Sequence, residues 1–240
     1  MRVLLSALLL SLTACAPSVT TASRPDDGLR AAFSEAGVAW VAAGRACVAR
    51  APSFQVSCPA VPRAADVAWQ AGQAWAGVPS LGVIVTLDGA PRTVTVGRVA
   101  ALSAGRVYRE NGTAVDYAGT PAAGVLGTPA AALTGGDGQE YVLLDGRVVR
   151  VADGWALPGA AFTVLNWRAD GVQGDQQSQV EIPAGTYRLT GDHLERRDAA
   201  GVLRGRVPHP PGRLGMVGAW LVTVDARGAV RVFTPDLAAR

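Results

Sequence analysis

The residue types that most often do chemistry are scarce in this chain of 240 residues. It holds two histidines, His193 beside Asp192 and His209 between prolines, and neither has a second histidine at metal-ligand spacing. All 22 basic residues are arginine. Without a lysine amine, a Walker A phosphate loop, Schiff-base chemistry and a Ser–Lys catalytic pair are excluded. We expect no catalytic set, no cofactor and no metal, and interpret both histidines as solvated loop residues.

Carboxylates remain candidates for catalysis, because a pair of them can hydrolyse a glycosidic bond and the two partners can lie far apart in sequence. The five glutamates all fall near predicted turns or strand ends: Glu35, Glu110, Glu140, Glu181 and Glu195. This placement favours surface positions for each of them. Asp170 and Asp175 could supply oxygens to Ca²⁺, but the EF-hand pattern is missing, and a solvated loop is the preferred interpretation.

The first 15 residues, MRVLLSALLLSLTAC, place Arg2 before an apolar run that ends in small residues and Cys15. The run is about ten residues, half of what a membrane-spanning helix needs, which is typical of a signal peptide. Leu12-Thr13-Ala14-Cys15 resembles the lipobox of bacterial lipoproteins. That resemblance implies cleavage before Cys15, a diacylglycerol on its sulfur and, usually, acylation of its new amino group. The alternative is an ordinary secretory signal with a chance cysteine.

The lipobox resemblance implies an exported protein that is anchored in a membrane by its N-terminal lipid. Ala16 favours the outer membrane, on its periplasmic side, if the host has two membranes. Loss of Arg2 leaves 21 arginines against 19 acidic residues, an excess too small to indicate a nucleic-acid partner. We expect a signal peptide over 1–14, a flexible tether over 15–28 and one folded domain over 29–240.

Two further cysteines, Cys47 and Cys58, lie eleven positions apart. Export would place them where disulfides form, and a disulfide closing so short a loop contributes on the order of 3 kcal/mol. The spacing fits neither C-x-x-C nor a zinc set. We predict a structural disulfide between them; a pair of free buried thiols or a metal or redox pair are the alternatives.

Hairpin signals dominate the elements that must position these residues. Residues 140–151 form two strands around Asp145-Gly146, and residues 219–233 form two more around a turn that ends at Gly228. Weaker turns follow at Gly89, Gly112 and Gly191. Together with β-branched residues in alternation, these turns predict an all-β chain. A short helix is expected only over 27–36, capped by Asp26 or Asp27.

The hairpins recur with glycine turns at intervals of 28 to 45 residues, close to the size of a propeller blade. The final unit, VTVDARGAVRVFTPD, resembles one blade of bacterial propellers with NHL-type repeats, although no WD or GH signature is present. The resemblance implies a small β-propeller of five or six blades. A β-sandwich, an irregular barrel and a mixed α+β domain remain alternatives.

A chain with few reactive groups is better suited to binding than to catalysis. We therefore predict an envelope binding or assembly module with a protein partner, and keep a cell-envelope hydrolase acting on glycan or peptide as the alternative. The six tryptophans are interpreted mainly as residues of the core, although exposed ones could stack on sugars or anchor a partner. The arginines of the predicted strands are interpreted as a solvated sheet face.

Overall fold

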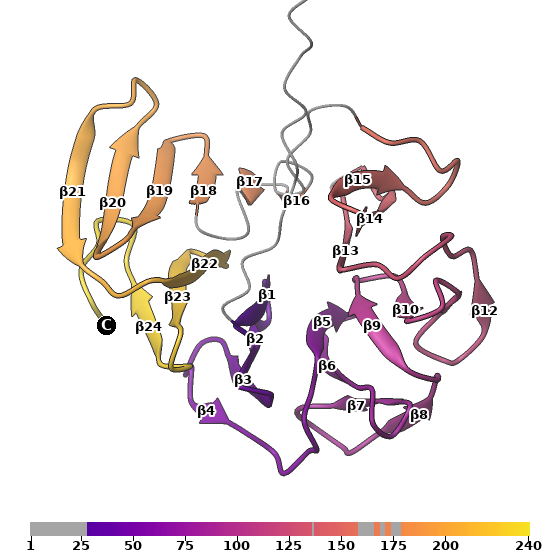
Figure 1. The fold of residues 1–240 in the computed structure, drawn as a ribbon. Coiled ribbons are helices and arrows are strands. Elements are labelled where there is room, and N and C mark those ends of the chain that lie inside the picture. Colours follow the sequence, from indigo (N-terminus) through magenta and orange to yellow (C-terminus); the bar gives the residue numbers. More distant parts are fainter. Residues whose placement is uncertain (1–27, 136, 158–165, 169–170, 174–178) are drawn as a thin grey trace, which may run out of the picture.

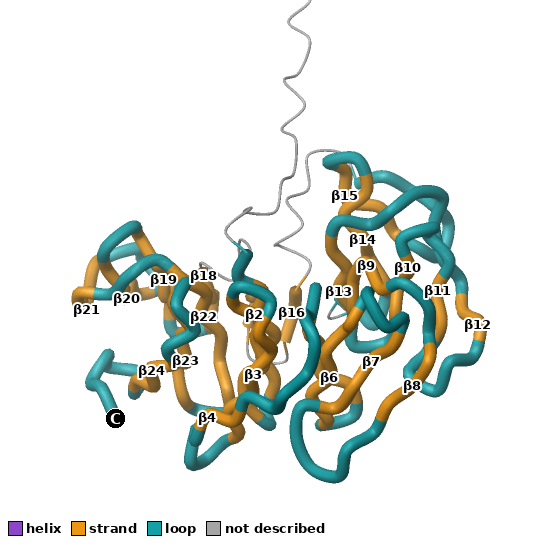
Figure 2. Tube along the Cα trace, turned by 60° about the horizontal axis from the view of Figure 1, so that its bottom comes forward, coloured by secondary structure: helices purple, strands orange, loops and turns teal. Residues whose placement is uncertain are grey.

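The described part of the chain consists of β-strands and the turns between them. This computed structural model describes residues 28–135, 137–157, 166–168, 171–173 and 179–240. Among these residues no helix is found, and the strands form six separate sheets (Figure 2). The all-β prediction is confirmed.

The six sheets follow one another along the sequence, and we number them in that order. Sheet 1 contains β1 (Arg30–Ser34), β2 (Gly37–Ala42), β3 (Arg45–Arg50) and β4 (Val56–Ser57). Sheet 2 contains β5 (Asp66–Gln70), β6 (Gln73–Val78), β7 (Val83–Thr86) and β8 (Thr93–Thr95). Sheet 3 contains β9 (Val99–Leu102), β10 (Val107–Arg109), β11 (Ala114–Val115) and β12 (Pro121–Ala122).

The second half has the same sequential order. Sheet 4 contains β13 (Ala131–Thr134), β14 (Glu140–Leu144) and β15 (Arg147–Arg150). Sheet 5 contains β16 (Asn166–Arg168), β17 (Gly171–Gln173), β18 (Gln179–Ile182), β19 (Gly185–Thr190), β20 (His193–Asp198) and β21 (Leu203–Pro208). Sheet 6 contains β22 (Gly212–Val217), β23 (Trp220–Asp225) and β24 (Val230–Phe233).

The sheets are arranged around a common centre, as the blades of a propeller are (Figure 1). Strand β5 packs on β1 and on β9, β9 also packs on β13, and β22 packs on β1 and β18. The order around the centre is therefore sheet 5, 6, 1, 2, 3 and 4. Each described pair of strands within a sheet is antiparallel and joined by a short connection. The fold is propeller-like, with six sheets where five or six were predicted.

Sheets 1 and 2 are each buried on both faces, because each lies between two neighbouring sheets and successive residues of a strand point to opposite sides. In β2, Val38 and Trp40 pack toward sheet 6, whereas Ala39 and Val41 pack toward sheet 2. In β6, Trp75 faces sheet 3 and its neighbours face sheet 1. This explains why these strands are apolar without interruption instead of alternating with polar residues. The core is accordingly a series of layers between sheets.

The two three-stranded sheets are each extended by a short backbone bridge. Val149 of β15 bridges Ala156, and Phe233 of β24 bridges Ala239. The backbone hydrogen bonds from Leu157 to Val148 and from Arg240 to Val232 continue these pairings. Sheets 4 and 6 therefore also approach the four-stranded pattern of sheets 1, 2 and 3.

The predicted hairpins are present. Asp145 and Gly146 both have positive φ angles, of 49° and 73°, as a two-residue turn of the type favoured between strands requires. Three further turns share the sequence Asp-x-x-Gly, with Asp116, Asp198 and Asp225 as their first residues. In each, one carboxylate oxygen accepts the backbone N–H groups two and four residues later. The turn of the C-terminal unit in sheet 6 thus recurs in sheets 3 and 5.

The helix expected over 27–36 is wrong, since residues 30–34 form β1. This strand pairs with β2 from Arg30 opposite Val41 to Ser34 opposite Gly37. The indole N–H of Trp69 also donates to the carbonyl of Ala32, at 2.9 Å, from the neighbouring sheet. Alanine-rich sequence favours a helix only weakly, and strand pairing with this contact from sheet 2 outweighs that preference.

Candidate functional site

The most exposed large apolar side chain of the described residues belongs to Leu126, at 96%. It lies at the rim of a cavity of about 650 Å³ between sheets 3 and 4. We call this cavity the apolar groove; its apolar lining is Ala122, Val125, Leu126, Leu144, Val149, Val151 and Ala156. Burying a leucine side chain is worth about 2 kcal/mol, so its exposure is not explained by folding.

Close backbone contacts hold the segment that carries Leu126. The N–H of Val125 donates to the carbonyl of Gly112 at 2.9 Å. Gly112 has a φ of +80°, and a Cβ there would lie 2.2 Å from the carbonyl oxygen of Val125. Only glycine therefore allows the β10–β11 turn to approach the segment so closely. Gly112 therefore permits the backbone path of this segment, and on that path Leu126 is exposed.

Trp155 is a second exposed apolar side chain near the groove, with 52% of its surface accessible. Its neighbours Gly154 and Ala156 line the groove. The Arg150 guanidinium lies 5.4 Å from the centroid of the indole, and Asp153 holds that guanidinium through two hydrogen bonds of 3.1 and 2.5 Å. The hydrogen bond from Arg150 lowers the pKa of the Asp153 carboxyl, so this arrangement persists at mildly acidic pH.

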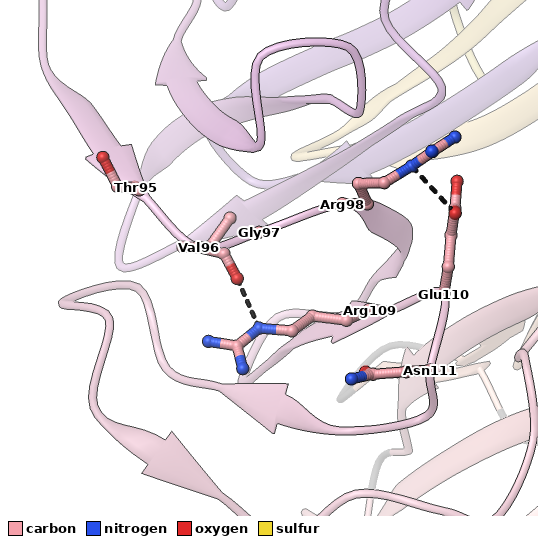
Figure 3. A pocket seen from close by; sticks show the side chains of 7 residues that line it. All are labelled: Thr95, Val96, Gly97, Arg98, Arg109, Glu110 and Asn111. Atoms are coloured by element: carbon pink, nitrogen blue, oxygen red, sulfur yellow. Dashed lines mark hydrogen bonds and ion pairs between the residues drawn. The ribbon is translucent and has the colours of Figure 1, made fainter.

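A second pocket, of about 520 Å³, lies beside the β10–β11 turn. We call it the Arg109 pocket; Thr95, Val96, Gly97, Arg98, Arg109, Glu110 and Asn111 line it. Arg98 and Glu110 turn toward each other and form an ion pair of 2.9 Å (Figure 3). Arg109 and Asn111 extend from the turn in a common direction, away from that pair (Figure 3).

Glu140, expected at the surface, is instead only 8% exposed, so that expectation is wrong. Its carboxylate accepts hydrogen bonds from the hydroxyls of Ser103, Thr134 and Tyr108, the last at 3.2 Å. Ser103 directly follows β9 and Tyr108 lies in β10, both of sheet 3, whereas Glu140 begins β14 of sheet 4. The carboxylate therefore joins two sheets. Glu195 is buried as well, beside Arg197 at 3.1 Å.

Asp66 makes a corresponding connection between sheets 2 and 3. One of its carboxylate oxygens accepts the backbone N–H of Leu102 at 3.0 Å, and the other accepts that of Val67. Burial raises the pKa of the neighbouring Tyr117 hydroxyl, and the negative charges of Asp66 and Glu140 raise it further. Asp66 and Glu140 are thus both engaged in connections between sheets, where they act as acceptors.

The two histidines have different surroundings. His193 begins β20 and is half-buried; its Nδ1 contacts the Asp192 carboxylate and lies 3.0 Å from the Arg206 guanidinium. His209 is only 2% exposed, which corrects the expectation of a solvated loop. Its Nδ1–H donates to the carbonyl of Pro210 at 2.6 Å, and the Thr223 hydroxyl lies 2.7 Å from Nε2. Burial lowers the pKa of His209, which favours the neutral form of the ring.

The cysteine predictions have different outcomes. Cys47 in β3 and Cys58 just after β4 form the predicted disulfide, with their Cα atoms 4.1 Å apart. Cys15, the predicted lipid attachment site, lies outside the described residues, as do Asp170 and Asp175. Where the structure describes the chain, no helix is long and apolar enough to cross a membrane, and no three His, Cys, Asp or Glu side chains gather as metal ligands would.

The apolar groove and the Arg109 pocket were not found from the sequence. One signal was available for the groove: residues 123–128, AGVLGT, place adjacent apolar side chains between glycines, outside any predicted hairpin. For Arg109 there was none, since an arginine before an Asn-Gly turn is ordinary. Whether the side chain of Arg109 lines a pocket depends on how sheet 3 packs against the chain that follows sheet 2, and local sequence does not show this.

Comparisons with known proteins reveal similarity of fold. No family model and no curated protein sequence matches the chain. A streptogramin B lyase is 15% identical with a TM-score of 0.44, over 92% of this chain and 84% of that one. PorZ, a surface component of the type-IX secretion system of Porphyromonas gingivalis, is 13% identical with a TM-score of 0.52, over 88% of this chain. Virginiamycin B lyase from Staphylococcus aureus is 14% identical with a TM-score of 0.42, over 90% and 84%.

At these identities the similarity concerns the fold alone. The chain spans 37% of the length of PorZ, which is the one of these three with a TM-score above 0.5. That match agrees with the propeller-like arrangement of sheets described above.

Proposed function

We propose that this protein is an exported lipoprotein of the bacterial cell envelope, anchored through Cys15, whose propeller-like domain binds a protein partner at the apolar groove. The lipobox-like residues 12–15 support the anchor. The groove supports the binding role. The resemblance to PorZ, itself a bacterial surface component, supports the fold and leaves the partner open.

The exposure of Leu126 beside a preformed apolar groove carries the proposal. A volume of about 650 Å³ is in the range of sites that take a ligand or an anchoring side chain. Trp155, held by Arg150 and Asp153, adds an aromatic residue of the type that dominates binding energy in protein interfaces. The partner that fits this surface is a protein segment with at least one large apolar side chain, which would fill the groove while Leu126 and Trp155 cover it.

The alternative of a glycan or peptide hydrolase receives no support from the buried carboxylates. Glu140 and Asp66 each accept several hydrogen bonds from residues of their own and neighbouring sheets. Their position between sheets explains their burial without a substrate.

Site-specific photocrosslinking in cells tests the binding role. A photoreactive residue at position 126 is expected to give a discrete crosslinked product, while the same residue at position 81 is the matched control. Leu81 is also exposed, at 60%, but it lies on sheet 2 away from the groove. The product from position 126 should disappear when Val149→Asp places a charge in the groove. Equal products from both positions, or a product that survives Val149→Asp, would contradict the proposal.

The anchor is tested separately. Cys15→Ser should release the protein from the membrane fraction and abolish labelling by radioactive palmitate, because the sulfur would no longer carry lipid. Retention of both would contradict the lipoprotein proposal without affecting the groove.

A further inference from the structure

Arg109 is held in place by neutral acceptors. Its Nε–H donates to the carbonyl of Val96, and its Nη1 donates to the Thr113 hydroxyl at 3.3 Å. Of the five N–H donors of a guanidinium, these bonds use two. Among the described residues, Nη2 has no hydrogen-bond acceptor and Arg109 has no carboxylate partner. The side chain is therefore fixed in position, with donors directed into the Arg109 pocket.

Asn111 is oriented by the same set of hydrogen bonds. The Thr113 hydroxyl accepts from Arg109, so its own proton goes to Asn111 Oδ1, at 2.7 Å. The backbone N–H of Thr113 also donates to Oδ1, at 3.1 Å. Both lone-pair directions of that oxygen are thus used, which places the amide N–H₂ of Asn111 on the side of the pocket. Two neighbouring side chains of the β10–β11 turn therefore present donors together (Figure 3).

The charges in the pocket define the ligand that fits it. Arg98 is offset by Glu110, at 2.9 Å, so the uncompensated charge of the lining residues is the single positive charge of Arg109. A group with one negative charge neutralises it, whereas a dianionic phosphate would leave a negative excess next to the Glu110 carboxylate. A guanidinium presents parallel N–H groups that match the two oxygens of a carboxylate.

From these contacts we propose that the Arg109 pocket is a binding site for a carboxylate group, held by the Arg109 guanidinium and the Asn111 amide. The carboxylate is supplied by a peptide, either from an acidic side chain or from a free chain end. The pocket adjoins the apolar groove, because Asn111 of the pocket and Gly112 of the groove are consecutive residues. Carboxylate binding does not require the groove to be occupied.

Modification of arginine by phenylglyoxal, read by mass spectrometry on the full-length protein in membranes, tests the proposal. Acetate at constant ionic strength should slow the modification of Arg109 by about fivefold, because a bound carboxylate covers its Nη groups. Arg204, which is paired with Asp198 at 2.6 Å, is the internal control and should not change. Chloride should give no protection and inorganic phosphate less than acetate. Absence of protection by acetate, or equal protection by phosphate, would overturn the proposal.

Two variants test whether protection by acetate arises at the Arg109 pocket and whether it depends on the apolar groove. Asn111→Asp should abolish protection by acetate, because it places a negative charge beside the ligand; protection that persists in this variant would overturn the assignment of Asn111. Leu126→Asp, which disturbs the groove, should leave protection unchanged, so failure of the groove proposal and failure of this one are distinguishable. N-acetylglycine, whose carboxylate is a chain end, and N-acetylaspartic acid α-amide, whose free carboxylate is the side chain's, then distinguish the two sources, and the stronger protector identifies the source.

Discussion

The two contact regions between sheets 3 and 4 have opposite character. In the interior of this contact, the Glu140 carboxylate accepts hydrogen bonds from the hydroxyls of Ser103, Tyr108 and Thr134, and all of this polar cluster except the half-buried Thr134 is buried. At the rim, Leu126 and the groove beside it leave apolar surface open to solvent. A surface in which the polar groups are satisfied internally and the apolar groups are left exposed is suited to holding another molecule.

This difference predicts that the polar cluster contributes mainly to stability and the groove rim mainly to binding. Residues of the polar cluster satisfy one another, so the removal of one leaves buried partners without a hydrogen bond. Residues of the groove rim make few contacts within the chain, so their removal should affect a partner more than the fold. Two variants test this separation and a third tests a turn of sheet 3 outside both regions; their expected effects decrease in the order given.

Glu140→Ala should have the largest effect. It removes the acceptor of two buried hydroxyl groups, those of Ser103 and Tyr108, and of the half-buried Thr134 hydroxyl, and we expect the free energy of unfolding to fall by about 3 kcal/mol or more. Urea denaturation followed by tryptophan fluorescence measures this change. The matched control is Glu181→Ala, whose carboxylate is exposed and should matter by less than about 1 kcal/mol. Similar losses in both variants would show that Glu140 does not join the sheets.

Trp155→Ala should lower affinity for the partner about tenfold, which corresponds to about 1.4 kcal/mol, while changing stability little. The indole is half exposed and is fixed by Arg150, so its loss removes contact area more than core packing. The yield of the crosslink from position 126 gives the measurement. Trp155→Phe should retain part of the crosslinking yield. A large fall in the free energy of unfolding with unchanged crosslinking would show that Trp155, like the polar cluster, contributes to stability and not to binding.

Asp116→Asn should have the smallest effect, visible only as a change in pH dependence. Hydrogen bonds from the backbone N–H groups of Thr120 and Ala118 lower the pKa of Asp116 in the folded protein. Its contribution is therefore present above the unfolded pKa and is lost as pH falls below about 4. Thermal unfolding from pH 7 to pH 3 should decline less steeply in the variant. Superimposable pH profiles for both proteins would contradict this role for the turn.

Much of the fold could be predicted from the sequence. The hairpin at Asp145-Gly146, the all-β class and the pairing of Cys47 with Cys58 follow from local signals, because turns and short loops involve neighbouring residues. The approximate repeat also indicated a ring of sheets. The short helix was wrong because its residues pair with β2 and contact Trp69, and such distant partners cannot be identified from local composition.

Less of the candidate site than of the fold could be predicted from the sequence. Glu140 and His209 were expected at the surface because each lies near a turn, yet both are buried by neighbouring strands. Burial of a polar residue depends on whether distant residues supply its hydrogen bonds, as Ser103 does for Glu140. The Asp-x-x-Gly turns were visible in the sequence, but their equivalence emerged only from identical backbone bonding around Asp116 and Asp225.

The sequence by itself determined the strands, the tight turns, the disulfide partners and the resemblance to a lipoprotein at Cys15, because each depends on residues close together in the chain. Tertiary structure alone decided which carboxylates are buried, where Leu126 is left exposed and which donors Arg109 and Asn111 direct into one pocket. These features arise where sheets meet, and the positions of such meetings depend on the packing of residues that are far apart in sequence.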